Sequence, residues 1–203
     1  MAFKPQEPSH LFCWLLFAVA AAAPFPFASV SPVAISLWCG LAGLAVLGLA
    51  FRPPTLTAPL LVAAAVLVIT SSYMALLYLQ TETRPVISSL SHPIWAQASQ
   101  LLGTPLTASS SIAKDLPFLA AGAPLLTLLL FVGGYMCGGD EILARRLLRT
   151  IAWSGGCYAI YAIGAYAIEP TMVLWQEKTA YIGNLTGTFT NRNAAAVYFG
   201  SAA

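Results

Sequence analysis

A run of small, polar and charged residues at 183–193 lies directly before an apolar segment. Asn191 or Asn193 is suited to cap the helix that this apolar segment predicts, and Arg192 lies between them. The free N–H groups of a helix start and a guanidinium together suit phosphate or pyrophosphate. The pattern therefore indicates an anion site. The alternative is that the polar residues only cap the helix and that Arg192 reaches towards lipid headgroups.

The same loop supplies a second cation and two carboxylates. These are Lys178, Glu177 and Glu169. Glu177 and Lys178 can also be read as an ordinary solvated pair. No metal is expected, because the sequence has no HExxH motif and no acidic cluster, and its four cysteines form no CxxC pair.

The segment 187–193 reads Gly-Thr-Phe-Thr-Asn-Arg-Asn and is followed by Tyr198 and Phe199. It resembles the signature of the O-antigen ligase family, which includes the O-antigen polymerases. In that family Gly-Thr-Phe-x-Asn-x-Asn leads into a transmembrane helix. The segment 92–95, His-Pro-Ile-Trp, is also similar to a part of some members.

The resemblance implies a glycosyltransferase of the bacterial inner membrane that uses no metal or other cofactor. Such enzymes take a glycan from an undecaprenyl-pyrophosphate carrier and pass it to lipid A-core or to a growing polysaccharide. Arg192 is then the candidate catalytic residue, because a cation stabilises the departing pyrophosphate. The candidate substrate-binding residues are Lys178, Thr188, Asn191 and Asn193, with Lys178 as the second candidate cation. Glu177 and Glu169 are the candidate bases for the acceptor hydroxyl group.

Members of this family have many more helices than this chain, and a larger outer loop with further Arg and His residues. We therefore expect the chain to be the N-terminal part of such an enzyme, truncated and inactive by itself. The alternative is a non-catalytic membrane remnant or subunit, or a transport or assembly component of polysaccharide export. Ion-coupled transporters usually carry ionisable groups within the membrane, and the apolar segments here contain almost none.

The amino-acid composition indicates what kind of segments flank the loop 169–192. Of the 203 residues, 59% are hydrophobic and 8% are charged, whereas about 25% are charged in a typical soluble domain. This excess of apolar surface indicates a lipid bilayer as the main partner. The net charge of +2, without a basic run, gives no indication of nucleic acid.

A hydrocarbon core about 30 Å thick requires about 20 apolar residues of helix. The sequence therefore predicts an all-α, polytopic integral membrane protein with about five complete transmembrane helices and the start of a sixth. These form one membrane domain, 1–203, with helices near 11–30, 33–51, 60–79, 118–137, 151–168 and, incomplete, 194–203. A secretory signal peptide is the alternative for the first segment, but its leader lacks net positive charge.

The loops predict the orientation and some local structure. Arg145, Arg146 and Arg149, with Lys4 and Arg52, indicate a cytoplasmic N-terminus and outer loops at 80–117 and 169–192. Within the first outer loop, a short surface helix is expected to begin at Ser91-His92-Pro93 and to end at Gly103. Pro24, Pro26 and Pro32 predict a bend between the first and second helices. Asp140 is expected to cap the helix that follows it.

Overall fold

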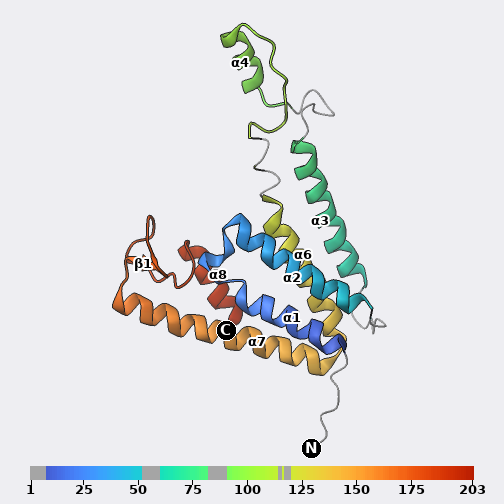
Figure 1. The fold of residues 1–203 in the computed structure, drawn as a ribbon, viewed down its shortest axis with the longest axis vertical. Coiled ribbons are helices and arrows are strands. Elements are labelled where there is room, and N and C mark those ends of the chain that lie inside the picture. Colours follow the sequence, from blue (N-terminus) through green and yellow to red (C-terminus); the bar gives the residue numbers. More distant parts are fainter. Residues whose placement is uncertain (1–7, 52–59, 82–90, 114–115, 117–119) are drawn as a thin grey trace, which may run out of the picture. The chain divides into compact units, whose positions relative to one another are not determined.

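The computed structural model describes residues 8–51, 60–81, 91–113, 116 and 120–203 (Figure 1). These contain seven α-helices, a short 3-10 helix and one pair of two-residue strands. The chain divides into two compact units, one formed by residues 1–59 with 129–203 and the other by residues 60–128. The single membrane domain expected for 1–203 stays a prediction.

The prediction of five complete transmembrane helices and the start of a sixth is wrong. Within the described residues, two helices are long and apolar enough to cross a membrane, α2 (Pro32–Ala50) and α7 (Glu141–Ile168). α1 (Pro8–Ala22) has 15 residues and α6 (Gly122–Gly138) has 17. At about 1.5 Å per residue, both are shorter than a hydrocarbon core of about 30 Å.

The predicted helix 11–30 is interrupted by the expected bend. α1 ends at Ala22, two residues before Pro24, which has no N–H group and disfavours helical backbone in the residue before it. A 3-10 helix, η1 (Phe27–Ser29), follows, and Trp38 Nε1 of α2 donates to Ser29 Oγ at 2.7 Å. The bend at Pro24 and Pro26 is therefore confirmed, and it shortens the first helix.

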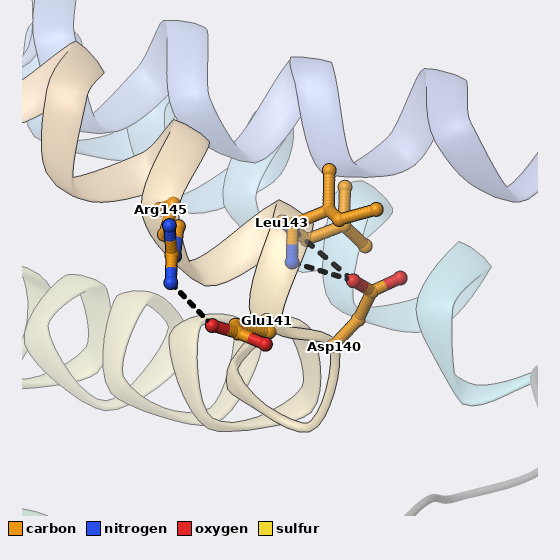
Figure 2. Close-up of polar contacts among 5 residues, drawn as sticks. Asp140, Glu141, Leu143 and Arg145 are labelled. Atoms are coloured by element: carbon orange, nitrogen blue, oxygen red, sulfur yellow. Dashed lines mark hydrogen bonds and ion pairs between the residues drawn. The ribbon is translucent and has the colours of Figure 1, made fainter.

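α7 begins ten residues earlier than the predicted start at residue 151, so the three arginines lie within the helix and not in a loop before it. Arginine is a good helix former, and the cap lies further upstream. Asp140 Oδ1 accepts from the N–H groups of Ile142 at 2.8 Å and Leu143 at 3.3 Å (Figure 2). The prediction that Asp140 caps this helix is confirmed.

α1 lies between α2 and α7 in the first unit (Figure 1). The buried core is built around it from Cys13, Leu16, Phe17, Ala45, Leu49, Cys137 and Leu143. Small residues allow the helices to approach. A Cβ at Gly133 of α6 would lie 2.6 Å from the Leu16 side chain, and a Cβ at Gly48 of α2 would overlap the Phe12 ring.

The second unit contains α3 (Leu60–Thr81), α4 (Ile94–Leu102) and the first part of α6. α4 is the short surface helix expected in the first outer loop, and it ends at Gly103, whose φ is +66°. The N-cap of α4 is Pro93, which makes no side-chain cap bond. Instead, the N–H of Ile94 donates to His92 Nδ1 at 3.2 Å.

The predicted sixth segment corresponds to α8 (Arg192–Ala202), which has 11 residues and packs against α7. Of the charges used for the predicted orientation, Lys4 and Arg52 lie outside the described residues. The cytoplasmic position of the N-terminus therefore stays a prediction.

Candidate functional site

The loop between α7 and α8 begins with a two-residue hairpin. β1 (Met172–Val173) pairs antiparallel with β2 (Gln176–Glu177). At its tip, the Trp175 ring makes edge contacts with the rings of Phe25 and Phe27, at centroid distances of 6.2 and 5.1 Å. These contacts hold the hairpin against the turn that joins α1 to α2.

Lys178 fixes the next part of the loop. Its backbone N–H donates to the Thr171 carbonyl at 2.8 Å, and its Nζ donates to the Asn184 carbonyl at 2.9 Å. Partial burial lowers the pKa of the Lys178 ammonium from its usual 10.5, because desolvation disfavours the charged form. Lys178 therefore stabilises the loop with one of its three donors and can offer the others to an anion.

Arg192, the first residue of α8, contacts the same part of the loop. Its guanidinium carbon lies 5.5 Å from the centroid of the Tyr181 ring, which is a cation–π contact. The N–H of Asn184 donates to the Tyr181 carbonyl at 3.1 Å, so Tyr181 to Asn184 forms one turn. Lys178 and Arg192, far apart in the sequence of the loop, thus contact opposite ends of this turn.

Residues 186–189, called the motif segment below because they include the first three residues of the motif 187–193, are buried, in contrast to the residues on either side. Gly187 has φ +59°, and a Cβ there would lie 2.9 Å from Ala162 Cβ of α7. Phe189 packs against the rings of Tyr198 and Phe199 of α8, at centroid distances of 5.2 and 6.1 Å. The segment therefore joins α7 to α8 and fixes the position from which α8 starts.

Two hydroxyl groups in this buried segment are unsatisfied. Thr186 and Thr188 are each 2% exposed, and neither Oγ1 atom has a hydrogen-bond partner in the part of the chain that the structure describes. A buried polar group without a partner costs about 1–3 kcal/mol. Thr188, a predicted substrate-binding residue, is thus directed into the protein, so substrate contact would require local opening.

α8 starts as the sequence predicts. Asn191 is the N-cap, and its Oδ1 accepts from the N–H of Asn193 at 2.8 Å. The Arg192 and Asn193 side chains are exposed. The cap role falls to Asn191, which leaves the Asn193 side chain available for other contacts.

The two candidate bases have different surroundings. Both are exposed, but Glu169 Oε1 accepts from the Thr171 hydroxyl at 2.6 Å, whereas the Glu177 carboxylate on β2 makes no hydrogen bond within the described residues. The structure thus brings Lys178 and Arg192 to one turn, with Asn191 and Asn193 in the first turn of α8. The sequence alone did not predict that Tyr181 contacts Arg192 and that Asn184 contacts Lys178. The residues of a turn do not indicate which distant side chains contact it.

No group of three His, Cys, Asp or Glu residues that could hold a metal ion occurs among the residues with described positions. No protein-family model matches the chain, and no curated protein or solved structure matches it significantly.

Proposed function

We propose that this chain is part of a membrane glycosyltransferase of the O-antigen ligase and polymerase type. It would take a glycan from an undecaprenyl-pyrophosphate carrier and transfer it to lipid A-core or to a growing polysaccharide, on the periplasmic side of the inner membrane. The observation that carries the proposal is the start of α8. There the exposed Arg192 lies over the Tyr181 ring, in the turn that Lys178 also contacts, and the buried motif segment packs against α8 through Phe189.

The chemistry requires a cation at the leaving group. In the reaction, the bond between the anomeric carbon and the pyrophosphate oxygen breaks, and the pyrophosphate leaves with the electron pair. The acceptor hydroxyl oxygen forms the new bond to the anomeric carbon and loses its proton. The Arg192 guanidinium and the N-terminus of α8 stabilise the negative charge that develops on the leaving oxygen.

The other residues have supporting roles in this proposal. Lys178 neutralises the second phosphate, and the exposed Asn193 amide hydrogen-bonds sugar or phosphate oxygens. Asn191 keeps the helix start in place, since its side chain caps α8. Glu177 is the better placed of the two candidate bases, because its carboxylate makes no hydrogen bond or ion pair within the described residues, whereas a Glu169 oxygen already accepts from Thr171.

A membrane location is part of the proposal and is supported by two helices. Only 17% of the apolar window of α2 and 11% of that of α7 is buried within the chain. A core helix of a soluble protein buries most of such a surface. We propose that lipid covers α2 and α7, and that the loop 169–191 lies at the periplasmic end of α7.

The test replaces Arg192 in the complete native reading frame, in cells that lack their own copy of the gene. Arg192→Ala is expected to reduce glycan transfer at least 100-fold, in the range found when one stabilising donor is removed from an active site. Arg192→Lys should retain part of the activity, because it keeps the charge but not the planar fork. The carrier-linked donor should accumulate in the Ala variant.

Arg145→Ala is the matched control, since Arg145 is an exposed arginine paired with Glu141 at 2.5 Å. It should leave glycan transfer unchanged. The amount of each variant in the membrane fraction separates loss of chemistry from loss of protein. Unchanged surface glycan after deletion of the gene would refute the proposal and favour a non-catalytic membrane component.

A further inference from the structure

A groove of about 480 Å³ lies between α1 and α7 and combines cationic with aromatic side chains. α7 contributes Arg146, Arg149, Trp153 and Cys157, which follow one another at intervals of three or four residues and so lie along one helix face. α1 contributes Trp14 and Ala21, which are seven residues apart and also share a face. From Arg146 to Cys157 the helix rises about 16 Å.

One end of the groove is positively charged without a matching carboxylate. Arg145, outside the groove, is paired with Glu141 in the first turn of α7 (Figure 2). Arg146 and Arg149 make no ion pair within the described parts of the chain. Two like charges on adjacent turns repel each other, and an anion held between them relieves this repulsion.

The other end of the groove is apolar. On α7 this end holds Trp153, which is 76% exposed, and Cys157, and α1 adds Trp14, which is 44% exposed, and Ala21 to the lining of the groove. The two hydroxyls that line the groove are satisfied within α7. Thr150 Oγ1 donates to the Arg146 carbonyl and Ser154 Oγ to the Ile151 carbonyl, each at 2.9 Å. This end therefore offers apolar contact area to a hydrocarbon chain, and its hydroxyl groups need no hydrogen bond from a ligand.

We propose that this groove binds an acidic phospholipid. The headgroup phosphate contacts Arg146 and Arg149, and one acyl chain lies along Trp14, Ala21 and Trp153. Along α7 the two arginines come before Trp153 and Cys157, as phosphate and acyl chain follow one another in a lipid. A soluble phosphate would use the arginines but not the tryptophans. The inference does not depend on glycan transfer.

The position of the groove suits such a ligand. α7 is one of the two described helices that are both long and apolar enough to cross a membrane, and the arginines lie near its first turns. Basic pockets between membrane helices bind acidic headgroups, and tryptophan is enriched at the level of the headgroups. Arg146 and Arg149 together therefore favour an acidic lipid over a zwitterionic one.

The test uses the purified full chain in mild detergent with equal amounts of phosphatidylglycerol and phosphatidylcholine. Bound lipid is counted by native mass spectrometry. The unmodified chain should retain mostly phosphatidylglycerol, and the Arg146→Gln/Arg149→Gln variant should retain at least tenfold less. Arg145→Gln, the matched control outside the groove, should behave as the unmodified chain. Equal retention by the double Gln variant would overturn the proposal, as would equal binding of both lipids to the unmodified chain.

A second measurement tests the proposal without replacing an arginine. Phosphatidylglycerol brominated in its acyl chains should quench tryptophan fluorescence of the unmodified chain more than brominated phosphatidylcholine does. The difference should shrink in Trp153→Phe, which keeps an aromatic ring but removes one emitter at the groove. Displacement of the lipid by millimolar inorganic phosphate would contradict the lipid as occupant and indicate a free-phosphate site.

Discussion

Gly187 and Ala162 pack so closely that α7 has no room for a side chain at position 187. A Cβ on Gly187 would lie 2.9 Å from Ala162 Cβ and 3.6 Å from Ala162 Cα. The glycine also has φ +59°, which disfavours residues with a Cβ. This contact ties the motif segment to α7, and through Phe189 it fixes the start of α8.

Gly187→Ala is therefore expected to destabilise the first unit. Overpacking costs about 1–3 kcal/mol, and the left-handed backbone adds about 1–2 kcal/mol. Gly183→Ala is the control, because Gly183 has φ +76° but open space around it, so it reports the backbone term alone. Thermal unfolding in detergent measures both. Equal losses in the two variants would contradict the close contact with Ala162.

Phe12 and Gly48 should be energetically coupled. A Cβ on Gly48 of α2 would overlap the Phe12 ring of α1, so Gly48→Ala is expected to cost about 1–3 kcal/mol in unfolding free energy. Phe12→Leu alone should be milder, and in its background Gly48→Ala should cost less. The double-mutant cycle measures this coupling. Gly43→Ala, at an open site in the same helix, is the control, and additive effects at Phe12 and Gly48 would count against the contact.

Asn191 should stabilise the start of α8 through its side chain. Asn191→Ala removes the acceptor of the Asn193 N–H and is expected to lower the free energy of unfolding by about 0.5–2 kcal/mol. Asn191→Asp keeps an acceptor and should restore stability. Asn193→Ala is the comparison, since its side chain makes no cap bond in the described structure. Hydrogen exchange at the first turn of α8 is the measurement, and a change equal to that in Asn193→Ala would argue against the cap.

The lowered pKa of Lys178 predicts that the free energy of unfolding changes with pH in the alkaline range. Its folded pKa is lowered by burial from 10.5, so the native state loses the proton first as the pH rises. Between the folded pKa and 10.5 the unfolded state binds more protons, and stability rises with pH relative to Lys178→Met. Melting temperatures of both proteins across this range measure the effect. A difference that falls with pH would have the wrong sign.

Several local features followed from the sequence alone. Asp140 and Asn191 cap helices as predicted, and Gly103 ends the surface helix 94–102. These succeeded because caps and left-handed helix ends depend on the residue itself and its near neighbours. The number of membrane-spanning helices was not predicted correctly from the sequence. An apolar window shows what a segment can bury, but not how long its helix is. The prolines predicted the bend, and yet α1 already ends at Ala22, well inside the predicted helix 11–30.

For the candidate site, the sequence indicated residues but not their arrangement. The sequence indicated Arg192 and Lys178, but only the tertiary structure places both at the turn Tyr181–Asn184. It also decided that Thr188 is buried, and that Arg146 and Arg149 share a groove with Trp14. Such contacts join residues far apart in the chain. They depend on how whole helices pack, which local propensity and composition do not determine.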